Sequence, residues 1–473
     1  MIRYLIHPFS MLVAALFFLS ACQQHSPHFN TYYITTQGND THSGLNQNKA
    51  WSSFKHALEV VKPGDTVYIK AGHYTDNNLY VGYISGTKQS PISFIGYYQS
   101  PGDIKPKTFD PHQSITPEIP SSDLFPTLDG EFKDDHYSGI EINNNNYIHL
   151  KNLHVTGYQS NISLYEADHN LLHNMIVSKA EDSVAHNGFG LTLKNSNHNT
   201  LQYILAISNQ GENISFQQSN YNALEDCQSH GGLPDDDKGQ KDGTDYYIVI
   251  AQSHHNTISK CLAQRHSPVK HGGHGIGIKA KGIDSYNNTI TDSVIRGMSK
   301  GFYVNHHQTF NNEFINCTTY GDEAMSGLTT RGFIVRDGAH HNTFRKCKGE
   351  ALDFAFALYD SHEDGGYKQE QNNNLFTQCE LTNTMQSIIF FEHDAKNNVF
   401  DKMVINEAPR LIMTASNMQE DSNAWTGNIL KNSQLINVHE IGLVSQPNSG
   451  HNALNIQNIN YSIQEKPAQQ PDQ

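Results

Sequence analysis

The clearest pattern in the chain is a short phrase that recurs at a near-regular interval. Each copy reads asparagine, any residue, an apolar residue, two mostly polar residues, and a small or apolar residue. The copies begin at Asn170, Asn199, Asn222, Asn256, Asn288, Asn312, Asn342, Asn374, Asn398, Asn428 and Asn452. A period of about 20 to 35 residues is typical of a solenoid, in which each unit buries its apolar face only against its neighbours.

The segments that precede these asparagines alternate between outward and inward residues in the manner of strands. Examples are residues 188–194 (GFGLTLK), 246–251 (YYIVIA), 275–280 (GIGIKA), 301–305 (GFYVN) and 332–336 (GFIVR). Their Ile, Val, Phe and Tyr side chains suit a pleated surface, and no helical stripe separates them. We therefore predict an all-β fold, a single-stranded right-handed parallel β-helix of about 11 to 13 coils with loops in the longer intervals.

The repeat phrase also places turn residues and cysteines. Asparagine tolerates the left-handed backbone region, so stacked turns should align these side chains in a ladder. Histidine precedes five of them, and we expect these histidines at the surface: His169, His198, His255, His341 and His451. Five cysteines follow a repeat asparagine by five residues and should stack inward: Cys227, Cys261, Cys317, Cys347 and Cys379. Two neighbouring sulfurs can then approach, at least one thiol stays free, and the spacing does not suit zinc.

The N-terminus predicts export. Residues 1–22 combine a positive residue, an apolar stretch and small residues before Cys22, which is typical of a secretory signal. Residues 19–22 (LSAC) resemble the bacterial lipobox. That resemblance implies acylation of Cys22 and, because Gln23 follows, the outer membrane of a Gram-negative bacterium, with the lipid anchor as the only membrane contact. A plain signal peptide is the alternative.

The remaining chain is predicted to hold one elongated domain. We expect a tether over residues 23–31, the β-helix over 32–463 and a disordered tail over 464–473. Residues 52–61 (SSFKHALEVV) predict a short amphipathic helix, which suits the polar cap that a solenoid needs over its first coil. Residues 32–74 resemble the opening of bacterial β-helix polysaccharide lyases, which supports this architecture.

The net charge and its distribution limit the classes of partner that the protein can bind. The formal net charge of −15 makes nucleic acid an improbable partner, and a mean hydropathy of −0.57 does not suit a membrane-embedded protein. Between residues 260 and 300, however, seven Lys or Arg stand against two acidic residues. A basic strip on an acidic body predicts a surface for a polyanion, and ordinary scatter of surface charge is the alternative.

Strand alternation predicts which side chains line one outer face. If Ile276 and Ile278 point inward, then Gly275, Gly277 and Lys279 point outward. The equivalent outward places at successive strand ends are Lys194, Gln217, Ala251, Lys279, Asn305, Arg336, Tyr359 and Glu392, with Tyr247 and Tyr303 further back on the same face. Coils are about 4.8 Å apart, close to one sugar residue per coil. A row of Tyr, Gly, Lys, Asn and Arg therefore predicts a sugar-binding face.

Two long loops flank this face, at residues 228–245 and 263–275. The first holds five aspartates, and clustered carboxylates predict a site for a hard cation such as Ca²⁺. Asp237, Asp242 and Asp245 are the candidate ligands. A solvated acidic loop is the alternative.

The stretch 211–305 resembles family 9 polysaccharide lyases, the calcium-dependent pectate lyase type. The matching phrases are NALEDCQSH, then KDGTDYYIVIA, GHGIGIKAKG and NTITDSVIRGMSKGF. The resemblance implies that Asp242 is a calcium ligand and that Lys279 is the catalytic base. The family's strand with paired aspartates is absent, and His271 and His274 lie where carboxylates are expected.

We therefore predict a polysaccharide lyase that cleaves an acidic, uronate-containing polysaccharide by β-elimination in a groove along the β-helix. Lys279 or His274 would remove the proton, and Tyr303 would protonate the leaving oxygen. The substrate's carboxylate would be held by Arg336 or by a cation on Asp242. The further substrate-binding candidates are Arg265, His271, Lys281, Arg296, His306 and Tyr247.

Two other functions fit the same fold. A glycoside hydrolase of an acidic or sulfated polysaccharide needs two carboxyl groups across the scissile bond, and Asp242, Asp245, Asp360, Glu363 and Glu392 are available. A non-catalytic, surface glycan-binding protein is the third possibility, although the density of His, Lys, Asp and Tyr in one stretch favours an enzyme.

Overall fold

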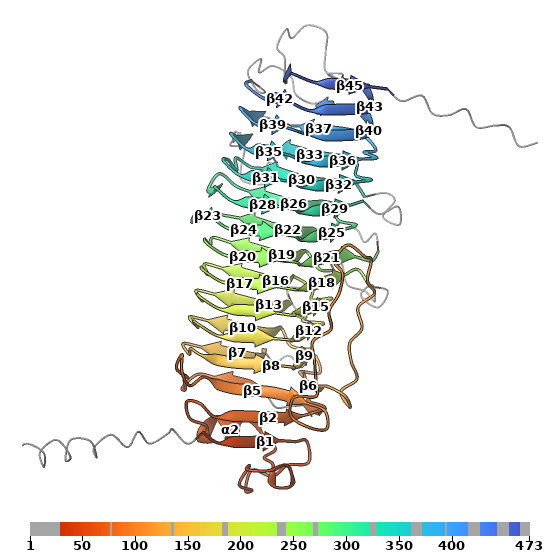
Figure 1. The fold of residues 1–473 in the computed structure, drawn as a ribbon. Coiled ribbons are helices and arrows are strands. Elements are labelled where there is room, and N and C mark those ends of the chain that lie inside the picture. Colours follow the sequence, from red (N-terminus) through yellow and green to blue (C-terminus); the bar gives the residue numbers. More distant parts are fainter. Residues whose placement is uncertain are drawn as a thin grey trace, which may run out of the picture.

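The computed structural model describes residues 29–75, 78–133, 137–181, 188–233, 243–267, 273–321, 328–360, 371–392, 395–414, 426–441 and 454–463. Over these residues the chain winds as a parallel β-helix, drawn in Figure 1 as a stack of coils that rises from β1 to β45. The fold predicted from the repeat is confirmed. The calls on Cys22, Asp237, Asp242, His271 and His451, and those on the signal and the tail, lie outside the described residues.

Three long parallel sheets, here sheets A, B and C, form the sides of the coil. In the described chain sheet A has 15 strands: β1 (Thr31–Ile34), β2 (Thr66–Lys70), β5 (Ile92–Tyr97), β8 (Ile148–Lys151), β11 (Leu171–His173), β14 (Thr200–Gln202), β17 (Ala223–Glu225), β20 (Thr257–Ser259), β24 (Thr289–Thr291), β28 (Glu313–Ile315), β31 (Thr343–Arg345), β35 (Leu375–Thr377), β39 (Val399–Asp401), β42 (Ile429–Lys431) and β44 (Asn455–Gln457). The asparagine phrase begins only at Asn170, so it misses the first coils, and sheet A exceeds the expected number.

Sheet B has 14 strands over the same described ranges: β3 (Gly72–Thr75), β6 (Pro126–Asp129), β9 (His154–Thr156), β12 (Ile176–Ser178), β15 (Leu205–Ile207), β18 (Gln228–Gly231), β21 (Leu262–Arg265), β25 (Val294–Arg296), β29 (Thr318–Tyr320), β32 (Lys348–Glu350), β36 (Glu380–Thr382), β40 (Val404–Arg410), β43 (Gln434–Glu440) and β45 (Asn460–Ser462).

Sheet C carries the predicted sugar-binding face. Its 12 described strands are β4 (Leu79–Val81), β7 (Ser138–Asn143), β10 (Ser160–Tyr165), β13 (Phe189–Lys194), β16 (Glu212–Gln217), β19 (Tyr246–Ala251), β22 (His274–Lys279), β26 (Lys300–Asn305), β30 (Arg331–Arg336), β33 (Phe354–Tyr359), β37 (Ser387–Phe391) and β41 (Ile412–Thr414). Two short pairs complete the described strands: β23 (Ser285–Tyr286) with β27 (Thr309–Phe310), and β34 (Gln371–Asn372) with β38 (Ala395–Lys396).

Within the described residues, two helical elements lie at the N-terminal end of the β-helix, η1 (Gln47–Lys49) and α2 (Phe54–Val60). The Ser53 hydroxyl accepts a hydrogen bond from the His56 amide and so begins α2, as the sequence predicts. Phe54 and Ala57 of α2 are fully buried against the first coils (Figure 1). In the described chain no helix is long and apolar enough to span a membrane.

Stacked side chains fill the interior. Ile, Leu, Val and Phe from all three sheets form one continuous core along the axis. The cysteines stack inward as expected: Cys227 and Cys261 form a disulfide between neighbouring coils, and Cys317, Cys347 and Cys379 are free and buried. Burial raises the pKa of the Cys347 and Cys379 thiols well above the usual range, so they behave as small apolar side chains.

The predicted asparagine ladder is present and buried. From Asn199 to Asn428, the amide oxygen of each asparagine accepts from the backbone N–H of the equivalent asparagine one coil earlier, as in Asn222 N to Asn256 Oδ1 at 2.9 Å and Asn256 N to Asn288 Oδ1 at 3.0 Å. The left-handed backbone falls on the residue before the asparagine instead, for example on His255 with φ of 57°. The described histidines of this phrase are exposed, as expected.

The ladder makes a testable contribution to stability. We expect Asn256→Ala to lower the free energy of unfolding by about 3 kcal/mol, because it leaves the buried Asn222 amide and the Ser219 carbonyl without their partners. Urea unfolding followed by circular dichroism measures this change. Thr257→Ala, at the exposed neighbouring position, is the control and should change the free energy by less than about 0.5 kcal/mol. Equal losses in both variants would contradict a structural role of the ladder.

Candidate functional site

The strand registers align side chains on the outer face of sheet C in three columns. The column at the strand ends holds Gln217, Ala251, Lys279, Asn305, Arg336 and Tyr359, which the alternation pattern predicts. The middle column holds Ser215, Val249, Gly277, Tyr303 and Ile334, and the column at the strand starts holds Glu212, Tyr246, His274, Lys300 and Arg331. Strands β16 to β30 thus bring charged, histidine and tyrosine side chains together on one face.

A chain of three titratable groups lies at the centre of this face. The Nδ1 atom of His274 is 2.9 Å from an Asp245 carboxylate oxygen, and its Nε2 atom is 2.7 Å from the Lys300 ammonium nitrogen. Because a lysine ammonium only donates, Nε2 is the acceptor and Nδ1–H donates to Asp245. The contacts therefore fix one neutral tautomer of the imidazole.

The pKa values in this chain follow from burial and charge. Burial lowers the pKa of His274 below its ordinary value, and the positive charge of Lys300 lowers it further, while the Asp245 hydrogen bond opposes the shift. Burial works against the charge of Asp245, but the hydrogen bond from His274 and the nearby positive charges of Lys300 and Lys279 together outweigh it and lower the pKa of that carboxyl group. At neutral pH the site holds a carboxylate and a neutral imidazole.

Aromatic rings fix the orientation of the imidazole and of Lys279. The Tyr246 ring stacks on His274 with centroids 4.5 Å apart, and the Lys279 ammonium lies over the Tyr246 ring, 3.8 Å from its centroid. The same ammonium is 4.0 Å from a carboxylate oxygen of Glu212. A ring face and a carboxylate both attract a cation, so the Lys279 ammonium is held over the Tyr246 ring and beside Glu212.

Tyr303 lies across His274 and depends on a glycine. The two rings meet edge to face at 5.5 Å, and a Cβ atom at Gly277 would lie 2.2 Å from the Tyr303 ring. Gly277 therefore leaves the space in which this ring lies flat on β22. Burial raises the pKa of the Tyr303 hydroxyl well above its ordinary value, so the group keeps its proton. This hydroxyl has no hydrogen-bond partner among the described residues.

Arg336 closes the site on its C-terminal side. Its Nε atom pairs with the Asp337 carboxylate at 2.9 Å, and its guanidinium carbon is 5.7 Å from the centre of the Tyr359 ring. Only 3% of the Arg336 side chain is exposed. Arg336 thus places a buried cation at this edge of the site, and a planar guanidinium is suited to a carboxylate.

The remaining predicted substrate-binding residues do not gather at this site. Arg265 is buried at the end of β21, where its Nε donates to the Ser267 carbonyl oxygen, and Arg296 lies on sheet B against the Tyr320 ring and the carbonyl oxygen of His112. Lys281 is exposed on the loop after β22, and His306 lies in the turn after β26 with φ of 73°.

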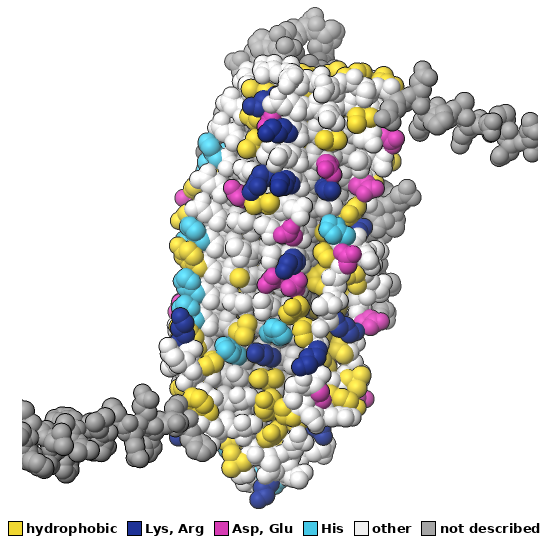
Figure 2. Space-filling view, in the orientation of Figure 1, with side chains coloured by type: hydrophobic (Ala, Val, Ile, Leu, Met, Phe, Trp, Pro, Cys, Tyr) yellow, Lys and Arg dark blue, Asp and Glu magenta, His cyan; other side chains and the backbone are white. Residues whose placement is uncertain are grey.

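The basic strip is therefore not one surface. Its members divide among the three sheets, since Lys260 pairs with Glu225 next to sheet A and Arg296 lies on sheet B, whereas Lys279 and Lys300 lie on sheet C. Figure 2 shows basic and acidic side chains next to one another over much of the face drawn there.

Two placements predicted from alternation were wrong. Tyr247 is fully buried in the core, and Gly275 is buried beside Ile295 and the next coil, so neither lies on the outer face. The paired registers skip the second residue of each strand, and strict alternation holds only from the third residue onward. Sequence reasoning consequently missed Tyr246, Lys300 and Glu212. The sequence did contain a signal for Lys300, because aligning residues 274–279 (HGIGIK) with residues 300–305 (KGFYVN) sets Lys300 beside His274.

Calcium stays a prediction. Of its three candidate ligands only Asp245 is described, and its carboxylate is already engaged by His274. In the described ranges no three His, Cys, Asp or Glu side chains lie together as metal ligands would. The described residues of the site carry several cations around one or two paired carboxylates, which does not fit a calcium site by itself.

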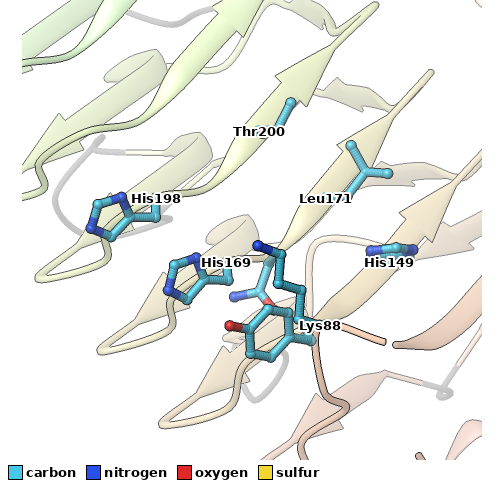
Figure 3. A pocket seen from close by; sticks show the side chains of 8 residues that line it. Lys88, His149, His169, Leu171, His198 and Thr200 are labelled. Atoms are coloured by element: carbon cyan, nitrogen blue, oxygen red, sulfur yellow. The ribbon is translucent and has the colours of Figure 1, made fainter. Parts of the chain in front are cut away.

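Two cavities of the described surface lie elsewhere. One, of about 360 Å³, opens on sheet A, and Figure 3 shows His169 and His198 above one another on neighbouring coils, with Lys88 and His149 nearby. The rings of Tyr147, His169 and His198 stack there at 4.9 to 5.0 Å. The other, of about 440 Å³, lies on sheet B beneath residues 119–122. We favour the sheet C site as the functional one, because groups with shifted pKa values contact one another there.

Two solved structures with TM-scores above 0.5 support the fold. A mannuronic acid specific polysaccharide family 6 lyase from human gut microbiota is similar, with a TM-score of 0.52, 10% identity and 91% of each chain covered. The catalytic domain of a GH87 α-1,3-glucanase in complex with nigerose has a TM-score of 0.52 and 13% identity over 86% of this chain and 66% of its own. Pectate lyase Pel9A shares 17% identity over 68% of this chain and 76% of its own, with a TM-score of 0.45.

A search of curated proteins found no match. The model of the family described as "Pel9A-like, right handed beta helix region" matches residues 32–342, which is more than half of the chain. The chain therefore belongs to the Pel9A-like right-handed β-helix family.

Proposed function

We propose that this protein is a polysaccharide lyase that cleaves an acidic, uronate-containing polysaccharide on the outer face of sheet C. The observation that carries the proposal is the neutral His274, held by Asp245 on one side and by Lys300 on the other. A β-elimination needs an unprotonated base beside cations that neutralise a carboxylate, and this arrangement supplies both.

In the proposed reaction His274 is the base. Its Nε2 lone pair takes the proton from the carbon that bears the uronate carboxylate, while Asp245 stabilises the imidazolium that forms. The electrons of the broken C–H bond form a carbon–carbon double bond to the adjacent carbon, and the bond from that carbon to the glycosidic oxygen breaks. Tyr303 gives its proton to the departing oxygen. The products are a chain with a new reducing end and a chain with an unsaturated uronate.

The cations bind the carboxylate in this proposal. Lys300 donates to His274 Nε2 in the free protein, and the substrate's carboxylate would draw it away and leave Nε2 free to act. Lys279 and Arg336, at the ends of β22 and β30 with β26 between them, would add two further cations on the same face. Because negative charge accumulates on the carboxylate in the transition state, fixed cations at this place lower the barrier more than they strengthen substrate binding.

An absorbance assay tests the reaction class. The protein is incubated separately with pectate, alginate, chondroitin, hyaluronan and fucoidan, and ultraviolet absorbance and reducing ends are followed together. We expect absorbance from an unsaturated product with at least one uronate polymer. New reducing ends without absorbance would replace the lyase by a hydrolase, and no change with any polymer would favour a binding protein.

The role of Lys279 is tested by substitution. We expect Lys279→Ala to lower kcat/KM about 10²-fold, because it removes one fixed cation from the reacting carboxylate. The control is Lys194→Ala, since Lys194 occupies the same column three strands earlier and its ammonium lies 5.9 Å from the Tyr165 ring. Rates from initial absorbance slopes decide the matter, and full activity of Lys279→Ala would remove this residue from the site.

A further inference from the structure

We infer that the site accepts only uronate units with a free hydroxyl group next to the bound carboxylate, and that Asn305 recognises this hydroxyl. The inference rests on the proposed function and goes beyond it, because it names the substitution pattern of the substrate. It predicts that O-acylated stretches of the same polysaccharide are rejected.

Asn305 lies at the end of β26, between Lys279 on β22 and Arg336 on β30. It points to the outer face of sheet C, in the column that holds the two cations. Only 7% of the residue is exposed, and its amide oxygen is buried without a hydrogen-bond partner among the described residues. An acceptor whose residue stands in register between Lys279 and Arg336 therefore has no donor in the described protein.

The Tyr303 hydroxyl, on the same strand, is also buried without a hydrogen-bond partner in the described chain. Tyr303 lies two residues earlier on the same outer face and is 2% exposed. More than nine in ten buried polar groups in native proteins are hydrogen-bonded, and each exception costs about 1 to 3 kcal/mol. These two atoms lie on the outer face of one strand inside the candidate site, where a ligand could supply the partners that the described protein does not.

The chemistry of the two atoms specifies the ligand. The Tyr303 hydroxyl can donate, which the glycosidic oxygen of the proposed reaction accepts. The Asn305 oxygen can only accept, so it needs an N–H or O–H group on the ligand. A carboxylate has no hydrogen to give, whereas a free sugar hydroxyl has one. Because Lys279 and Arg336 on either side would bind the carboxylate, the hydroxyl belongs to the same sugar unit or to its immediate neighbour.

Acylation of that hydroxyl should prevent binding in the reactive position. Acylation removes the hydroxyl hydrogen for which the Asn305 oxygen is the acceptor. It also adds an acyl group, and there is little space for that group next to a buried oxygen. Sites built around a hydrogen bond to the substrate reject analogues that lack it more strongly than apolar pockets reject a change of one methylene group.

The test compares matched polymers. O-acetylated polygalacturonate and polymannuronate are each assayed before and after mild alkaline deacetylation, with wild-type protein and with Asn305→Leu. We expect the wild type to prefer the deacetylated form by roughly 10- to 100-fold in kcat/KM. In Asn305→Leu the rate on the deacetylated form should fall, and the preference should approach one. Thermal stability should not fall, because leucine removes an atom that has no bond to lose.

The outcomes separate the two claims. Absence of unsaturated product from every polymer refutes the lyase assignment and this inference with it. A wild type that cleaves both forms at equal rates, or an Asn305→Leu variant that keeps the preference, refutes only the role of Asn305. A loss of thermal stability in Asn305→Leu would show that Asn305 is structural, which also refutes this role.

Discussion

Replacing His274 with alanine is expected to lower kcat/KM about 10³-fold, the largest loss of any single substitution at the site apart from those that unfold the protein. The imidazole is the one side chain of the described site that is both neutral at neutral pH and oriented by two hydrogen bonds. Without it the α-proton has no acceptor that is free of charge. Initial rates on the most readily cleaved polymer measure the loss.

His274→Asn is the matched variant. Asparagine can keep a hydrogen bond to Asp245 but cannot take up a proton, so activity should fall as far as in His274→Ala while the fold is better preserved. Circular dichroism and thermal unfolding establish that both variants are folded. If folded His274→Asn retains more than a tenth of the wild-type rate, another group is the base.

The pH profile reports the same residue independently. Burial and the charge of Lys300 lower the pKa of His274 below 6.5, so kcat/KM of the wild type should fall only as the pH drops below that value. Lys300→Met removes a positive neighbour, so the pKa of His274 should rise and the acidic limb should move to higher pH. Asp245→Asn removes the group that raises this pKa, and the limb should move to lower pH. An unchanged limb in both variants would exclude His274 as the titrating base.

The overall architecture could be predicted because it depends on a period and not on any one residue. A repeat that buries an asparagine in each successive coil from Asn170 onward leaves little choice of fold, and the buried ladder from Asn170 to Asn428 explains why the phrase recurs. The left-handed residue was misplaced by one position. The ladder asparagine bonds to neighbouring coils, so the backbone turn is made by the preceding residue, such as His255.

The site could be predicted only in part. The column from Lys194 to Tyr359 follows from alternation over the last four residues of each strand. The first residues of each strand could not be placed in this way, because the second residue lies at a corner of the coil and breaks the alternation. In β26 this second residue is Gly301, and a Cβ atom there would lie 2.2 Å from the Gly332 carbonyl oxygen. Because of this break in the alternation, Tyr246 lies on the outer face and Tyr247 lies in the core. Asp245 and His274 come from two different long loops. No local sequence pattern predicts that these two residues lie in contact.

Replacing Tyr303 with phenylalanine should lower kcat about 10²- to 10³-fold without lowering thermal stability. The hydroxyl keeps its proton because burial raises its pKa, and it has no partner in the described protein, so its removal costs the free protein no hydrogen bond. A substrate with a good leaving group, such as a uronide with a nitrophenyl aglycone, needs little protonation of the departing oxygen. The defect should therefore shrink with that substrate, which separates an acid from a residue that only packs.

Gly277→Ala tests the same role with Tyr303 left in place. The new methyl group would lie 2.2 Å from the Tyr303 ring, so the ring must move and its hydroxyl loses the reactive position. We expect a loss of kcat similar to that of Tyr303→Phe, and no further loss when the two changes are combined, because both remove one function. Ser215→Ala, in the same column two strands earlier, is the control and should leave the rate unchanged. Additive losses in the double variant would mean that Gly277 acts through something other than Tyr303, and the assignment of the acid would fall.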